Sequence, residues 1–232
     1  MTKNKNGQKI RNLIVGLEAA IVIICLSVSI TVWFRPLYYF DIGYLKIPQQ
    51  SGVPAEICKM NYDALIDYNL LFGNETLTFP TMTMSENGRI HFEEVKQIFF
   101  IIQMIAVTGT VAAAAFAIRS AVKCRKRQEK ACDPEQFRWM LCAVRITETI
   151  GGLVLLAVSI DWERSFALMH KLFFRNDYWL FDPKTDPVIR ILPDTFFLHC
   201  GILIVCLSVL FCVGLKILFY RKMRNIHGNH YV

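Results

Sequence analysis

The sequence predicts an all-α membrane protein in which four transmembrane helices carry a small extracytoplasmic cap. Hydrophobic residues make up 54% of the 232-residue chain. Four apolar stretches reach the roughly 17–25 residues that cross a bilayer. Lys and Arg are concentrated in segments next to these stretches, as is typical of membrane proteins. The predicted spans are residues 13–34, 98–118, 139–160 and 196–220. The length predicts a single membrane domain over 1–232.

The first span follows a basic segment, an arrangement also typical of a secretory signal peptide. Glu18 interrupts the apolar run, and no small-residue cleavage site follows it. The run is also long enough to cross a bilayer. We therefore expect a retained first helix.

The basic residues predict the orientation of the spans. Residues 1–12 contain four Lys or Arg and no acid, 119–138 contain seven against three acids, and the tail 221–232 is also basic. The positive-inside rule makes these segments cytoplasmic, so the connections 35–97 and 161–195 form the extracytoplasmic cap. The net charge of +7 then reflects topology and attraction to anionic membrane lipids, and we expect no nucleic-acid partner.

The first cap segment predicts a helix lying on the membrane surface. Pro54 begins this helix, which ends near Gly73. The residues spaced to line one face of it are Ile57, Met60, Leu65 and Tyr68. Asn87–Gly88 then predicts a turn that leads to His91.

Small, ionisable and thiol side chains predict how the spans pack. The small residues of 108–115 favour close packing at the centre of the bundle. Glu18, Arg145, Glu148 and Lys216 are expected to form structural pairs, with a substrate or ion path as the alternative. The eight cysteines include no CxxC pair, so we interpret them as small packing residues.

The second cap segment leads into the most informative stretch of the chain. Residues 166–197 combine many aromatic rings with one histidine, four aspartates and three prolines. Such a composition is typical of a membrane–water boundary. Asp186–Pro187 predicts a short helix that ends at Pro193, and Asp194 is placed to cap the fourth span.

Histidines are the candidate catalytic groups. His91, His170 and His199 are predicted near the outer boundary on three different segments, and we expect them to converge there. His199, in the first turn of the fourth span, is expected to be structural. A carboxylate such as Asp177 or Asp182 is expected to fix an imidazole tautomer.

Three chemistries are compatible with such a histidine site. Two imidazoles suit general acid–base catalysis. Histidines with an aspartate also suit zinc, although no tight ligand spacing is present. A covalent enzyme would need Ser85, Ser165 or Cys58 beside a histidine, and no nucleophile motif surrounds these residues.

The chain resembles the bacterial lipoprotein intramolecular transacylases at these residues. The matching pieces are Asn61-Tyr62 with Leu65, Gly88-x-x-His91-Phe92-x-x-Val95-Lys96, and His170-x-x-x-Phe174-x-Asn176-Asp177-x-Trp179-x-x-Asp182-Pro183, followed by Asp186, Leu192-Pro193 and Phe196-Phe197. The four-span layout also fits, so the resemblance covers most of the chain. One departure is Asp194, where the family more often has Glu.

The resemblance implies an acyl shift within one diacylglyceryl lipoprotein. This lipoprotein substrate and the membrane lipids are the expected partners. The sn-2 acyl chain moves to the α-amino group of the N-terminal cysteine and leaves the lyso-form lipoprotein. The catalytic histidines of the family carry over to His91 and His170, of which we favour the first as base and the second as acid. No cofactor and no metal are expected.

Further candidate site residues suit this chemistry. The predicted pocket walls are Tyr62, Phe92, Phe174 and Trp179, with a role as interfacial anchors as the alternative. Asn61 and Asn176 are candidate oxyanion donors, with a role as turn or cap residues as the alternative, and Asp177 and Asp182 are further candidate substrate-binding residues. The expected location is the bacterial plasma membrane, with the site at its extracytoplasmic face. A non-catalytic four-helix bundle and a membrane metallohydrolase remain as alternatives, and the oligomeric state stays open.

Overall fold

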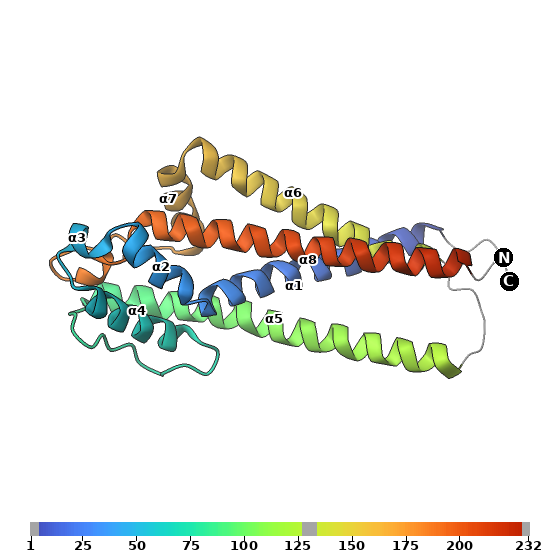
Figure 1. Ribbon diagram of the computed structural model, residues 1–232, viewed down its shortest axis with the longest axis horizontal. Coiled ribbons are helices and arrows are strands. Elements are labelled where there is room, and N and C mark those ends of the chain that lie inside the picture. Colours follow the sequence, from blue (N-terminus) through green and yellow to red (C-terminus); the bar gives the residue numbers. More distant parts are fainter. Residues whose placement is uncertain (1–4, 127–133, 229–232) are drawn as a thin grey trace. The chain divides into compact units, whose positions relative to one another are not determined.

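The computed structural model describes residues 5–126 and 134–228, with the backbone alone for 120–126, 134, 136 and 225–228. The described part of the chain is helical and contains no strand (Figure 1). In chain order the α-helices are α1 (Lys5–Trp33), α2 (Pro36–Tyr44), α3 (Ile47–Ser51), α4 (Ala55–Asn69), α5 (Glu86–Lys126), α6 (Trp139–Ile160), α7 (Trp162–Phe173) and α8 (Asp194–Gly228). Two 3₁₀ helices, η1 (Pro134–Phe137) and η2 (Pro187–Arg190), precede α6 and α8.

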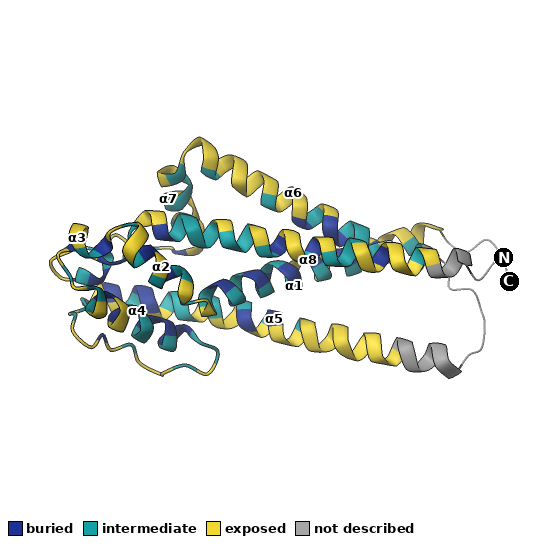
Figure 2. Ribbon diagram, in the orientation of Figure 1, coloured by how far each residue is buried: buried dark blue, intermediate teal, exposed yellow. Residues whose placement is uncertain are grey.

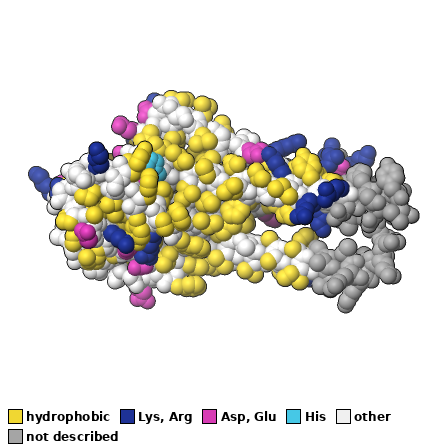
Figure 3. Space-filling view, in the orientation of Figure 1, with side chains coloured by type: hydrophobic (Ala, Val, Ile, Leu, Met, Phe, Trp, Pro, Cys, Tyr) yellow, Lys and Arg dark blue, Asp and Glu magenta, His cyan; other side chains and the backbone are white. Residues whose placement is uncertain are grey.

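Four of these helices are long and apolar enough to cross a membrane, which confirms the predicted fold class. They are Lys5–Trp33, Glu86–Arg119, Trp139–Ile160 and Asp194–Arg224. Figure 3 shows apolar side chains exposed over much of the face it draws. Exposed apolar side chains on long helices are expected where lipid takes the place of water.

The chain divides into two compact units, and each long helix contributes to both. One unit contains Val28–Met104 and Leu155–Ile204; the other contains Met1–Ser27, Ile105–Val154 and Val205–Val232. The candidate site lies in the first of these, the site unit.

The second unit is held by close helix contacts and a few polar bonds. A Cβ added to Gly16 would lie 2.6 Å from the Cβ of Cys142, and one added to Gly109 would lie 2.3 Å from a methyl of Val22. These distances show that α1 packs tightly on α6 and α5 through the two glycines. Asn12 donates to the Glu135 carbonyl at 2.8 Å.

The prediction that the small residues of 108–115 pack at the bundle centre is right only at Gly109. Thr108 and residues 110–115 are exposed, as the second half of α5 in Figure 2 shows. Ala106, one turn earlier, is buried instead. Composition predicts that small residues pack somewhere, but the direction of each side chain depends on the helix's rotation.

Of the four ionisable residues in the spans, two form a structural pair of the kind that the sequence predicts. Lys216 Nζ donates to Glu148 Oε1 at 2.6 Å, which joins α8 to α6. Glu18 and Arg145 are exposed. Six cysteines are described, and all of them have free thiols. Cys25, Cys58 and Cys212 are buried as packing residues; Cys124 and Cys132 lie outside the described side chains.

The site unit has an aromatic core. Tyr38 of α2 stacks on Tyr62 of α4 with ring centroids 3.9 Å apart, and Phe196 of α8 meets Tyr38 edge-on at 5.1 Å. The Tyr38 hydroxyl donates to the Ile191 carbonyl at 2.8 Å. This core therefore joins α2, α4 and α8 with the segment that follows η2.

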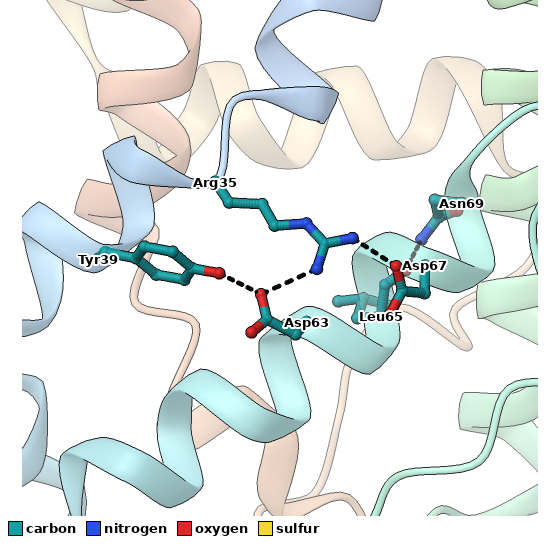
Figure 4. Close-up of polar contacts among 6 residues, drawn as sticks. All are labelled: Arg35, Tyr39, Asp63, Leu65, Asp67 and Asn69. Carbon is teal, nitrogen blue, oxygen red and sulfur yellow. Dashed lines mark hydrogen bonds and ion pairs between the residues drawn. The ribbon is translucent and has the colours of Figure 1, made fainter.

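An ion-pair cluster ties the start of α2 to α4 (Figure 4). Arg35 pairs with Asp63 at 3.2 Å and also with Asp67. The Tyr39 hydroxyl donates to Asp63 at 2.5 Å.

The predicted helix after Pro54 exists, but its end and its buried face differ from the prediction. It ends at Asn69, and Met60 is exposed. Its buried residues are Cys58, Asn61, Tyr62, Leu65, Ile66, Tyr68 and Asn69. The helix buries polar as well as apolar side chains. The amides of Asn61 and Asn69 donate to the Ile57 and Leu65 carbonyls one turn earlier in the same helix.

The predicted turn at Asn87–Gly88 is wrong, because both residues lie in the first turn of α5. The Ser85 hydroxyl accepts from the Gly88 amide at 3.0 Å and thus caps the helix. Asp186 accepts from the Ser85 amide at 2.7 Å. A Cβ on Gly88 would lie 2.3 Å from that carboxylate oxygen, so glycine is the residue that leaves the Asp186 contact undisturbed.

The elements predicted before the fourth span are present. The short helix after Asp186 is η2, and Asp194 is the first residue of α8. The Asp186 side chain does not cap η2 but bonds to the start of α5. It therefore links the segment carrying His91 to the one that follows His170.

Candidate functional site

His91 and His170 come together from two helices. His91 lies in the second turn of α5, and His170 lies in the last turn of α7. Their ring centroids are 6.1 Å apart, with an angle of 31° between the planes. Two imidazoles at this separation can act on two atoms of one small substrate group.

Aromatic rings enclose His91. Phe174 meets it edge-on at 4.7 Å and Phe181 at 5.4 Å, while Phe92 lies at 5.8 Å. The side chain is 5% exposed, and its Nδ1 is buried with no hydrogen-bond partner. Apolar walls and a second imidazole nearby favour the neutral ring.

A backbone carbonyl fixes the His170 ring. Its Nδ1 lies 2.8 Å from the Phe166 carbonyl oxygen. Since a carbonyl only accepts, Nδ1 must carry the proton, and in the neutral ring Nε2 then carries the lone pair. The expectation that Asp177 or Asp182 fixes the tautomer is wrong for this imidazole, because the helix itself supplies the acceptor.

The surroundings of His170 also set its basicity. Burial lowers the pKa of the His170 imidazole, and the Phe166 carbonyl and Asp194 carboxylate oppose this shift. Trp179 stacks on the ring at 4.7 Å, and Phe166 lies at 4.3 Å. The neutral imidazole is therefore the resting form near neutral pH.

The third histidine belongs to a different cluster. His199 Nδ1 lies 2.9 Å from both carboxylate oxygens of Asp41, which is fully buried on α2. The Tyr44 ring lies 5.9 Å from the imidazole. This pair ties α8 to α2, in agreement with the structural role expected for His199.

Two of the predicted substrate-binding residues lie inside the core. Asn61 is 0% exposed, and its amide donates to Ile57 O and Thr81 Oγ1. Its Oδ1 accepts from the Thr81 amide. Tyr62 is 4% exposed beneath Tyr38. Both side chains therefore stabilise the interior of the site unit.

The segment after α7 places the remaining predicted residues. Asn176 donates to Glu94 Oε1 at 2.9 Å. Asp177 is exposed, and Asp182, also exposed, accepts from the Lys184 amide at 2.9 Å. The two aspartates thus shape or flank the loop, whereas Asn176 faces the helix that carries His91.

Sequence reasoning missed three residues around the histidines: Phe166, Phe181 and Glu94. Phe166 precedes His170 by one helical turn, a spacing that places both on one helix face. Glu94 follows His91 by three residues, but only its contact with Asn176 distinguishes it from its neighbour Glu93. Phe181 lies in a loop, where no periodicity gives its direction.

The described side chains of residues 5–126 and 134–228 include no group of three or more His, Cys, Asp or Glu that could hold a metal ion.

Comparisons with known proteins identify the family and the fold. A family model described as lipoprotein intramolecular transacylase Lit matches residues 13–197. The solved structure of the membrane-integral lipoprotein intramolecular transacylase Lit from Bacillus cereus is 33% identical, covers 98% of this chain and 99% of its own, and has a TM-score of 0.77. A variant of that protein with a histidine-to-arginine substitution is 31% identical, covers 97% and 96%, and has a TM-score of 0.80. A search of curated proteins finds no match. The chain therefore belongs to the lipoprotein intramolecular transacylase family of membrane-integral acyltransferases.

Proposed function

We propose that this protein moves the sn-2 acyl chain of a diacylglyceryl lipoprotein to the α-amino group of its N-terminal cysteine. The observation that carries the proposal is the pair of imidazoles, His91 and His170, inside a wall of aromatic rings. Such a pair supplies one proton acceptor and one proton donor, the two groups that aminolysis of an ester needs.

The reaction needs a pocket because its ring is unfavourable in solution. Attack of the amine on the sn-2 carbonyl closes an eight-membered ring through the cysteine Cα, Cβ and sulfur, two glyceryl carbons and the ester oxygen. Holding the two reacting atoms together removes the cost of freezing the rotatable bonds of this ring, worth up to several kcal/mol. Phe174 and Phe92 beside one histidine and Trp179 beside the other restrict the space around the pair.

The tautomer of His170 gives the proton transfers an order. The substrate amine is an ammonium group at neutral pH, because α-amino groups titrate at about 7.7–8.0. Its first proton moves to Nε2 of His170, the lone-pair nitrogen of the neutral ring. The neutral amine then attacks the ester carbonyl carbon, and a C–N bond forms.

The second half of the reaction uses both histidines. His91 accepts the second amine proton from the tetrahedral intermediate. His170 returns its proton to the glyceryl oxygen as the C–O bond breaks. The products are an amide and a free hydroxyl group, and one proton leaves through His91.

The lowered pKa of His170 suits this sequence of steps. Moving a proton from an α-ammonium group, with a pKa of about 7.7–8.0, to an ordinary imidazole, with a pKa of about 6.5, costs about 2 kcal/mol. Each unit of pKa difference is worth about 1.4 kcal/mol. The lowered pKa adds to this cost. In return it makes the imidazolium a stronger acid towards the departing alkoxide.

We place the site at the extracytoplasmic face of the bacterial plasma membrane. The support is the charge pattern, in which the segments next to the site carry more acidic than basic residues while 1–12 and 119–138 are basic. The outer leaflet is also where a diacylglyceryl lipoprotein would present its N-terminus.

The test is mass spectrometry of a lipoprotein N-terminus from cells that express the protein. The wild type should leave the substrate mass unchanged while fragmentation places one acyl chain on nitrogen. His91→Gln and His170→Gln should abolish the shift, and His227→Ala in the basic tail should retain it. A diacylated substrate with a free amine in wild-type cells would contradict the proposal.

A further inference from the structure

Glu94 lies three residues after His91 on α5 and carries a carboxylate oxygen without a partner. Its Oε1 accepts from Asn176 Nδ2 at 2.9 Å. Its Oε2 is buried and makes no hydrogen bond in the described part of the chain. No Lys or Arg whose side chain is described forms an ion pair with this carboxylate.

Asn176 holds this carboxylate in one orientation. The Asn176 Oδ1 accepts from the Tyr178 amide at 3.1 Å, so the nitrogen of the side chain is directed to Glu94. With Oε1 occupied in this way, Oε2 is the oxygen available for a further donor.

The loop that holds Glu94 also contacts both histidines. Phe174 lies against His91 at 4.7 Å, and Trp179 stacks on His170 at 4.7 Å. Asn176, between these two in sequence, contacts Glu94. The carboxylate is therefore a neighbour of His91, because residues three apart on a helix share a face, and the loop that holds it also contacts His170.

A buried carboxylate oxygen without a donor is unfavourable, and a cation with N–H groups is its complement. His91 Nδ1, one helical turn away, is a second buried polar atom without a partner. The substrate of the proposed reaction brings one group with the required charge and donors, the α-ammonium group of its N-terminal cysteine.

We propose that Glu94 binds this α-ammonium group and that Asn176 orients Glu94; this inference rests on the proposed function. The carboxylate holds the amine next to His91, the imidazole that takes the second amine proton, and within the histidine pair. It selects lipoproteins whose N-terminus is free over those already acylated. It also favours product release, because the amide that forms has no charge to hold.

Binding of unreactive analogues tests the subsite without relying on turnover. A lipopeptide with ether-linked chains cannot transfer an acyl group, and it can be made with a free or an acetylated N-terminal cysteine. The purified full-length wild type should bind the free-amine form more tightly. Glu94→Gln should lose about 10- to 100-fold of this preference, the range for a hydrogen bond to a charged group.

Glu93→Gln is the matched control. It removes the same charge at the preceding position, but Glu93 is exposed and pairs with Arg89. Its preference for the free amine should equal that of the wild type. The wild-type preference should also decrease above pH ~8, where the α-amino group loses its proton.

Two measurements separate this inference from the proposed function. If the wild type transfers the acyl chain of an ester substrate while Glu94→Gln keeps the full preference for the free amine, the subsite is wrong and the function stands. If the wild type transfers nothing, the function is wrong. Should Glu94→Gln not fold, Asn176→Ala should show a smaller loss of the same preference, and an unchanged preference there would overturn the inference.

Discussion

Replacing Gly88 with alanine tests the link between the two segments that carry the histidines. A Cβ at this position would lie 2.3 Å from Asp186 Oδ1, whereas ordinary contacts begin near 3.4 Å. The carboxylate oxygen must therefore retreat by roughly 1 Å. Its 2.7 Å bond to the Ser85 amide would then exceed hydrogen-bond length.

The expected loss of stability follows from that bond. A hydrogen bond to a charged group is worth about 1.5–3 kcal/mol. Alanine in a helix regains up to about 1 kcal/mol relative to glycine. The net loss is therefore about 0.5–2 kcal/mol, which corresponds to an apparent Tm lower by about 1–8 °C for a chain of this size. Activity should decrease by more than stability alone explains, because a shift of about 1 Å can cost 100-fold.

The assay is thermal unfolding of the purified protein in detergent, followed by lipoprotein mass spectrometry. Gly43→Ala is the control, since a Cβ there meets nothing within 4 Å. It should be as stable as the wild type or more so. If Gly88→Ala were equally stable and fully active, the argument from the Asp186 contact would be refuted.

Three further predictions concern charge and hydrogen bonding. The lowered pKa of His170 means that it favours the folded state above the unfolded pKa of about 6.5, and that this contribution is lost as pH falls. The wild type should therefore lose more stability than His170→Gln between pH 6.5 and 5, and equal losses would contradict this. Tyr38→Phe leaves the Ile191 carbonyl without its donor and should cost about 1–3 kcal/mol, measured as a Tm lower by about 2–12 °C. Lys216→Met should lower the Tm by leaving Glu148 alone in an apolar segment, and adding Glu148→Gln should restore it; no recovery would show that the pair does not matter.

Local sequence patterns predicted the four spans, the helix after Pro54 and the short helix after Asp186, but not α2, α3 or α7. Four apolar stretches of spanning length correspond to the four long helices. Asp186–Pro187 and Pro193 bound a short 3₁₀ helix because proline fixes the backbone at its own position. The same approach was wrong at Asn87–Gly88. Glycine there serves the close approach of Asp186, almost 100 residues later, and does not form a turn.

The histidine pair shows where prediction from sequence ends. The family resemblance pointed to His91 and His170, and the helices bring their rings to 6.1 Å. The residues that surround the two imidazoles differ in whether the sequence alone could identify them. Phe166 acts on His170 from four residues earlier, so helical spacing alone would have found it.

Glu94 required the tertiary structure, because its partner Asn176 lies 82 residues away in a loop. A glutamate beside Glu93 in sequence looks like one of two solvated charges, and nothing local distinguishes them. In the structure Glu93 pairs with Arg89 on an exposed face, while Glu94 keeps a buried oxygen without a partner. The same residue type at adjacent positions thus has opposite surroundings, because successive side chains on a helix point about 100° apart. Folding stability favours pairing every buried acid, so an acid left half-paired beside two histidines is best explained by a partner that arrives with the substrate.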